Sequence, residues 1–258
     1  MTLQLEGATV GYHDQIVLDG LSFTVPPGCF TAVVGPNGCG KSTMLKALSR
    51  TMPVRSGAAT LDGVALGQLR SRAVARRLAL LPQQPVVPDG ITVRALVARG
   101  RHPYHSPLRQ RAAGDQEAVD TAMAATGVSE VADRPVTGLS GGLRQRVWIA
   151  MILAQDTEYV LLDEPTSFLD LAHQVDVLHL CQDMAAAGRT VVAVLHDLNQ
   201  AARYADQVVV MDSGRIVAEG APAEVIDAAL VQRVFGLAAD ISADPQTGDP
   251  MVIPLSRE

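Results

Sequence analysis

The sequence predicts an α/β fold that combines a parallel core sheet with a helical insertion. Short apolar runs, typical of strands buried on both faces, recur at residues 30–34, 78–81, 159–162 and 190–195. The first run leads through a glycine-rich loop into a helix that begins at Lys41, as in a parallel strand-and-helix unit. After residue 89 the strand pattern gives way to a succession of helical patterns.

Local patterns predict the elements in the first part of the chain. Apolar and polar residues alternate over residues 3–6, which predicts a strand. Helical periodicity predicts three helices in the insertion, at residues 92–99, 115–125 and 141–155, and Gly127 ends the second of them.

The C-terminal part continues with one long helix, a hairpin and an irregular tail. Residues 171–187 are amphipathic and end at Gly188. The apolar stripe of this helix predicts core packing and consists of Val175, Leu178, Cys181 and Met184. Residues 207–217 predict a hairpin, and the tail from residue 241 carries too many prolines to be helical.

Length and charge limit the class of protein. At 258 residues the chain is long enough for one domain with a sizeable insertion, residues 1–258 in all. We assign residues 1–88 and 156–258 to the core and residues 89–155 to the helical subdomain. The chain has 21 basic and 27 acidic residues, a net charge of −6, which argues against a nucleic-acid partner.

Arginines are nevertheless concentrated in one stretch of the chain. Between residues 63 and 113 there is a single acidic residue, Asp89. The arginines of this stretch are Arg70, Arg72, Arg76, Arg77, Arg94, Arg99, Arg101, Arg109 and Arg111. They are either solvated helix faces or a docking surface close to a membrane partner.

Cysteine usage and hydropathy indicate a reducing compartment. The chain has three widely spaced cysteines and no C-x-x-C pair, so we expect reduced, buried thiols and no zinc site. No run of 18 apolar residues and no signal-peptide pattern occurs. We therefore expect a cytoplasmic chain that does not span a membrane.

The glycine-rich loop after the second strand matches the pattern G-x-x-x-x-G-K-S, which binds nucleoside triphosphates. Glycines allow successive backbone N–H groups to face the phosphates, Lys41 would contact the β- and γ-phosphates, and Ser42 would ligate Mg²⁺. The candidate contacts in this loop and at the start of the helix are Gly35, Pro36, Asn37, Gly38, Cys39, Gly40, Lys41, Ser42 and Thr43.

Two further motifs point to phosphate chemistry. Ser140-Gly141-Gly142 precedes a helix, so that backbone N–H groups and the positive helix end could make a second phosphate contact. A buried strand ends in Asp163 and Glu164. Alternation along this strand end would direct Asp163 to Mg²⁺ and Glu164, as general base, to the attacking water.

Two weaker candidates follow other core strands. His196 comes after the strand at 190–195 and could contact the γ-phosphate, although a lone histidine there is more often structural. Gln83 follows the strand at 78–81 and could ligate Mg²⁺ or hold the attacking water.

Together these motifs resemble those of the ATP-binding subunits of ABC transporters over essentially the whole chain. The matching positions are the Walker A motif (35–42), the Q-loop (Gln83), the signature (139–145), Walker B (160–164), the D-loop (167–170, ending at Asp170) and the H-loop (His196). Tyr12 matches the aromatic residue that stacks on adenine. One departure is Leu143, where the signature usually has glutamine.

The resemblance implies the rest of the architecture. It implies a P-loop NTPase (RecA-like) core sheet with an N-terminal antiparallel β subdomain and an inserted α-helical domain. It also implies ATP and Mg²⁺ as cofactors, and ATP bound between two cassettes, so that two copies of this chain must meet. The other partners would be transmembrane permease subunits and, through them, a substrate-binding protein, with the chain at the cytoplasmic face of the membrane.

Three tracts refine the resemblance. Residues 92–103, 148–155 and 196–199 are similar to ATPases of importers for iron-siderophores, haem and vitamin B12, with the ferric-siderophore branch the most similar. Haem or vitamin B12 import stays open as an alternative. A non-transport ABC ATPase is disfavoured because the stretch from Gln83 to Leu139 is short and carries no heptads.

Overall fold

The computed structural model describes residues 2–105 and 114–256. These residues form two compact units, which we describe separately. Unit 1 comprises residues 1–68 and 178–258, and unit 2 comprises residues 69–177. Unit 2 contains the predicted helical insertion, residues 89–155, together with two strands of the core sheet.

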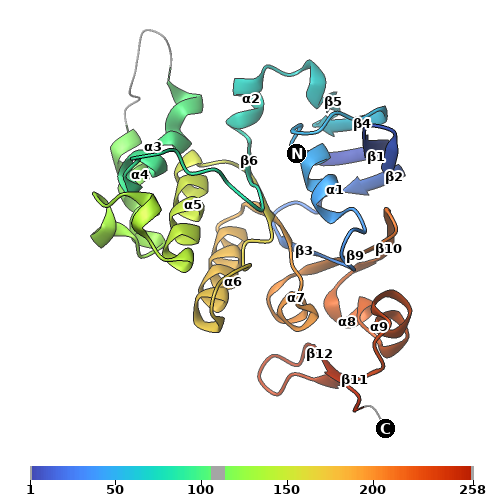
Figure 1. The fold of residues 1–258 in the computed structure, drawn as a ribbon. Helices are drawn as coiled ribbons and strands as arrows, with labels where there is room; N and C mark the ends of the chain where they lie inside the picture. The colour runs from blue at the N-terminus through green and yellow to red at the C-terminus, as the bar shows by residue number, and fades with distance from the viewer. Residues whose placement is uncertain (1, 106–113, 257–258) are drawn as a thin grey trace. The chain divides into compact units, whose positions relative to one another are not determined.

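Unit 1 contains an antiparallel sheet in the strand order β2-β1-β4-β5 (Figure 1). Its strands are β1 (Leu3–Tyr12), β2 (Gln15–Thr24), β4 (Ser56–Leu61) and β5 (Val64–Ala65). Buried apolar residues alternate with exposed ones along much of β1, as a sheet with one covered face requires. The strand predicted at residues 3–6 is therefore the start of a longer strand.

Unit 1 also contains most of the parallel core. β3 (Phe30–Val34) pairs in parallel with β8 (Thr190–Val194) and β9 (Gln207–Asp212), and β10 (Arg215–Gly220) pairs antiparallel with β9. Every residue of β3 and β8 is buried, which explains why they are continuous apolar runs in the sequence. The hairpin predicted at 207–217 is confirmed as β9 and β10.

The described part of unit 1 also contains helices and a two-stranded sheet, and one further helix spans the boundary with unit 2. The helices are α1 (Lys41–Leu48), α6 (Leu171–Ala186, shared with unit 2), α7 (Leu198–Tyr204), α8 (Pro222–Val225) and α9 (Ala228–Phe235). The tail is not helical, as predicted, but β11 (Ala239–Ala243) and β12 (Pro250–Pro254) form an antiparallel pair that the sequence did not predict. Two of its prolines lie at the ends of β12, where the loss of an N–H donor is tolerated.

Unit 2 contains two parallel strands and a group of helices. β6 (Leu78–Leu81) pairs in parallel with β7 (Tyr159–Asp163). The helices are α2 (Ser71–Ala75), α3 (Val93–Ala98), α4 (Asp115–Ala125) and α5 (Gly141–Gln155), with 3-10 turns at Arg99–Tyr104, Ser129–Val131 and Val136–Gly138. Figure 1 shows α3, α4 and α5 packed together. The helices predicted at 115–125 and 141–155 are confirmed to the residue.

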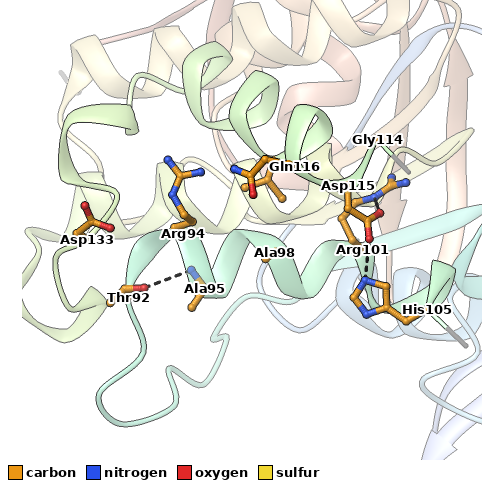
Figure 2. Close-up of a pocket in the computed structure, with 11 residues that line it drawn as sticks. Thr92, Arg94, Ala95, Ala98, Arg101, His105, Gly114, Asp115, Gln116 and Asp133 are labelled. Atoms are coloured by element: carbon orange, nitrogen blue, oxygen red, sulfur yellow. Dashed lines mark hydrogen bonds and ion pairs between the residues drawn. The ribbon is translucent and has the colours of Figure 1, made fainter. Parts of the chain in front are cut away.

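A buried charged cluster holds α4 against the segment that follows α3. Arg101 is only 8% exposed and pairs with Asp115 at 2.9 Å, while His105 contacts the other carboxylate oxygen of Asp115, also at 2.9 Å. Figure 2 shows both side chains turned toward that carboxylate. Arg101 is therefore a core residue. It belongs neither to a solvated helix face nor to a docking surface, the two roles predicted for the arginine-rich stretch. Arg109 and Arg111 lie outside the described residues.

Candidate functional site

The loop between β3 and α1 excludes side chains at two of its glycines. Gly35 has φ +151°, and a Cβ there would lie 2.1 Å from the carbonyl oxygen of Met211. Gly40 has φ +107°, and a Cβ there would lie 2.8 Å from Leu18. The loop pattern predicts glycine at these positions because phosphate approaches the backbone closely. In the structure, the neighbouring strands β9 and β2 also leave no room for a side chain there.

Positive charge is concentrated where this loop meets α1. Lys41 is 5% exposed, and its ammonium donates hydrogen bonds to the carbonyl oxygens of Gly35 at 2.7 Å and Pro36 at 2.9 Å. The N-cap of α1 is Gly40, which offers no side-chain acceptor to the first N–H groups of the helix. A buried ammonium beside an uncapped helix N-terminus is suited to bind a phosphate anion.

Cys39 lies in the same loop and is buried. Burial raises the pKa of its thiol, although the nearby Lys41 ammonium acts in the opposite direction. Cys39 is therefore a neutral part of the loop wall at physiological pH, in agreement with the expectation of reduced, buried thiols.

Two other predicted residues of unit 1 lie near the loop in the fold. Tyr12 ends β1, and its hydroxyl accepts a hydrogen bond from Lys46 of α1 at 3.2 Å. His196 follows β8, which pairs in parallel with β3 with Val33 opposite Val194. His196 is exposed and leaves the sheet at the same edge as the glycine loop, because the carboxyl ends of parallel strands share one edge.

In unit 2 the structure brings Gln83 and Glu164 into contact. Leu81 of β6 lies opposite Leu162 of β7, so the residues after both strands emerge together. The Gln83 amide donates a hydrogen bond of 2.7 Å to Oε2 of Glu164, and the Ser167 hydroxyl donates one of 3.0 Å to the same oxygen. Asp163, the last residue of β7, is 3% exposed.

The direction of the Glu164 side chain has a different origin from the one predicted. Glu164 lies outside β7 and has φ +54°, a left-handed conformation that non-glycine residues seldom adopt. The direction of the Glu164 side chain therefore depends on this turn and not on alternation along the strand. The resemblance to ABC ATPases indicates Ser167 only as part of the D-loop. Its place three residues after an acid, in a turn containing proline, was the one signal for its contact with Glu164.

The Ser140-Gly141-Gly142 segment forms the start of α5. Ser140 is the N-cap, and its hydroxyl oxygen accepts a hydrogen bond from the N–H of Leu143 at 3.4 Å. Ser140 and Gly141 are exposed, so the first turn of a 15-residue helix faces outward. Asp170, in the loop before α6, has a side chain that is 67% exposed.

The predicted magnesium ligands are chemically suitable. They are the Ser42 hydroxyl, the Gln83 amide and the Asp163 carboxylate, all of which supply oxygen, the donor that Mg²⁺ prefers. Across residues 2–105 and 114–256 there is no cluster of three or more His, Cys, Asp or Glu side chains able to hold a metal ion.

Among the described residues, none of the helices has the length and apolar character needed to cross a membrane.

These features define a P-loop nucleotide-binding protein. They are a strand followed by a glycine loop with a buried lysine, an uncapped helix after the loop, and a second strand with an acidic end. The family model described as ABC transporter matches residues 18–167, more than half of the chain. The chain therefore belongs to the ABC transporter family and is an ABC-type ATPase that drives transport. The predicted family, the fold class and the enzyme class are thus confirmed.

Comparisons with individual proteins extend over nearly the whole chain. It is 50% identical to the ferric enterobactin transport ATP-binding protein FepC of Escherichia coli (strain K12), over 99% of this chain and 94% of that protein. It is 44% identical to the hemin import ATP-binding protein HmuV of Rhodococcus jostii (strain RHA1), over 98% and 86% respectively. A solved ATP-binding subunit of an ABC transporter superposes with a TM-score of 0.77 at 26% identity, over 92% of this chain and 95% of the other.

Proposed function

We propose that this chain hydrolyses ATP to energise the import of a ferric siderophore through a separate transmembrane permease. The observation that supports this choice of cargo is the 50% identity, over almost the full length of both chains, to an ATPase named for ferric enterobactin transport. The hemin-import relative is 44% identical, so haem is the second candidate cargo. Vitamin B12 remains a more distant alternative.

In unit 1, the glycine loop and the start of α1 bind the triphosphate. The Lys41 ammonium, which donates to two loop carbonyls in the structure, turns to the β- and γ-phosphate oxygens when ATP is bound. Tyr12 stacks on adenine, and Lys46 orients its hydroxyl. His196 contacts the γ-phosphate from the carboxyl end of β8.

In unit 2, Glu164 is the general base. Its carboxylate accepts a proton from the attacking water, and Gln83 and Ser167 orient it through their hydrogen bonds to Oε2. Gln83 and Asp163 would be the Mg²⁺ ligands that unit 2 supplies, and Ser42 would be the one that unit 1 supplies. When bound, Mg²⁺ provides positive charge that offsets the negative charge of the phosphates.

The working unit contains two copies of the chain. The outward-facing first turn of α5, with Ser140, Gly141 and Gly142, and the exposed Asp170 contact ATP that is bound to the loop of the second copy. Such a site uses the free N–H groups of a helix N-terminus for a γ-phosphate. The two copies lie at the cytoplasmic face of the membrane against permease subunits, which receive cargo from a substrate-binding protein.

The helices of unit 2 supply the surface for the permease. A cavity of about 400 Å³ lies between α3 and α4, and Thr92, Arg94, Gln116 and Asp133 line its polar wall (Figure 2). The 92–103 tract, which resembles siderophore-importer ATPases, supplies one part of its lining. A cavity that mixes apolar side chains with both charges suits a short polypeptide segment of a permease.

The cargo is tested by deleting the gene. We expect the deletion strain to grow poorly with a ferric siderophore as the only iron source, and excess soluble iron to restore growth. The wild-type gene should restore uptake of the labelled ferric siderophore, whereas a gene encoding Lys41→Ala should not. If the deletion strain takes up siderophore normally but loses haem or cobalamin uptake, the assigned cargo is wrong and the assignment as an ATPase stands. If the deletion strain takes up siderophore, haem and cobalamin normally, a non-transport role is favoured.

A further inference from the structure

His173, in the first turn of α6, connects two parts of unit 2. Its Nδ1 atom lies 2.6 Å from Oδ1 of Asp170, which also accepts a hydrogen bond of 3.0 Å from the backbone N–H of His173. On the other side of the ring, Nε2 lies 3.3 Å from Nη2 of Arg146 in α5. The ring therefore lies between the loop that carries Asp170 and the helix that begins after Ser140.

These contacts determine which nitrogen of the ring carries the proton. A guanidinium group can only donate, so Nε2 of His173 must accept from Arg146. A carboxylate can only accept, so Nδ1 of His173 must donate to Asp170. One neutral tautomer, protonated at Nδ1, satisfies both partners at once. The hydrogen bonds from the backbone and ring of His173 hold the pKa of the Asp170 carboxyl below its usual range.

The ring also lies close to the start of α5. A Cβ placed on Gly142 would be 3.6 Å from Nδ1 of His173, which is van der Waals contact. Gly142 and Arg146 are one turn apart on α5, so His173 contacts this helix at Arg146 and lies close to its preceding turn. The His173 side chain is about one-third exposed, and packing restricts the positions that its ring can adopt.

We propose that His173 is a positioning residue that fixes the Ser140–Gly142 turn and Asp170 relative to each other. This inference rests on the proposed function, in which both groups contact the ATP of the second copy. Without the two ring hydrogen bonds, the exposed Asp170 carboxylate would be held only by the backbone N–H of His173 and would lose its connection to Arg146 of α5. The Ser140–Gly142 turn and Asp170 would then reach their positions on ATP together less often. The loss would therefore fall on turnover and not on the binding of ATP to the glycine loop in unit 1.

The test compares two histidines on the same helix. His173→Phe keeps an aromatic ring close to Gly142 and the backbone hydrogen bond to Asp170, but removes both hydrogen bonds of the ring. We expect its kcat to fall about tenfold or more, with the ATP dissociation constant of the isolated chain within about twofold of wild type. The control is His179→Phe, an exposed position on α6 where phenylalanine can keep the ring contact with Tyr204, and its kcat should not change.

Two further variants separate the contacts. His173→Asn keeps a donor close to the place of Nδ1 but cannot reach Arg146, and His173→Gln keeps an acceptor close to the place of Nε2 but loses the donor to Asp170. We expect an intermediate kcat for each, because a connection requires both contacts. Complete rescue by asparagine would overturn this connection, since the Asp170 contact alone would then suffice.

Other outcomes also overturn the proposal. Wild-type kcat in His173→Phe would do so, and so would a loss of kcat that His179→Phe reproduces. A fall in kcat matched by weaker ATP binding and a lower melting temperature would indicate a merely structural role. If the wild-type chain hydrolyses no ATP at any concentration, the proposed function fails first and this inference fails with it.

Discussion

The side-chain amide of Gln83 lies 2.7 Å from the carboxylate of Glu164, although the two residues are 81 positions apart in the sequence. Gln83 begins the connection to the helices of unit 2, and Glu164 is the proposed base. A movement of that connection would therefore act directly on the group that orients the attacking water.

Replacing Glu164 by glutamine should separate binding from chemistry. The amide keeps an oxygen that can accept from Gln83 and Ser167 but loses basicity, so we expect kcat to fall by about 10²-fold or more while ATP still binds. Steady-state hydrolysis and equilibrium nucleotide binding measure the two effects. Glu158→Gln, at the residue before the same strand, is the control and should hydrolyse ATP normally. Near-normal turnover in Glu164→Gln would assign the base elsewhere.

Lys41→Ala should abolish hydrolysis or weaken ATP binding strongly. The ammonium is the buried cation of the glycine loop, and its loss leaves the γ-phosphate without its main protein partner. Lys46→Ala, at a half-buried position of the same helix, should have a smaller effect, because it removes only contacts with the hydroxyl and ring of Tyr12. Wild-type affinity and turnover in Lys41→Ala would contradict the assignment.

The strands and helices were predictable where one local signal determined them. β3, β7 and β8 are buried on both faces and are therefore visible as apolar runs, and α5 begins after a serine cap. β11 and β12 were missed because their pairing depends on contacts with distant residues, such as the hydrogen bonds of 3.1 and 2.7 Å between Asn199 and Val252.

The site was predictable as a set of residue types but not as a set of contacts. Motif spacing indicated Gln83 and Glu164 separately, yet their hydrogen bond depends on the register of β6 against β7. Ser167 belongs to the D-loop motif, but that motif does not indicate its contact with Glu164, and His173 belongs to no motif. Their roles follow from side-chain geometry that a single sequence does not contain.

The buried pair of Arg101 and Asp115 should matter more for stability than the exposed pair of Arg94 and Asp120, although both join α4 to the α3 segment. Asp115→Ala leaves a buried guanidinium without its carboxylate partner, so we expect the free energy of unfolding to fall by about 3 kcal/mol. Asp120→Ala removes a solvated pair and should change it little. Urea unfolding of both variants makes the comparison, and equal losses would contradict it.

Cys181 should be the least reactive thiol of the folded chain. Burial disfavours the charged thiolate and raises the pKa of Cys181 to about 12, so almost none of the reactive form exists at pH 8. Cys29 is only partly buried and should react first with a thiol reagent, and all three cysteines should react after unfolding. Labelling of Cys181 in the native protein as fast as Cys29 would show that α6 opens readily.

Leu143→Gln, which restores the residue usual in the signature, should leave ATPase activity unchanged or raise it. Leu143 is half-buried in the first turn of α5, and its contact with Ser140 runs through the backbone N–H, which the substitution does not alter. Glutamine and leucine have similar helix propensities, so the turn should persist. Ser140→Ala is the contrasting variant. It removes the cap, which should cost about 1 kcal/mol of stability, and with it the proposed hydroxyl contact to ATP, so its activity should fall. A severe loss in Leu143→Gln at unchanged stability would mean that the leucine makes an apolar contact in the assembled transporter.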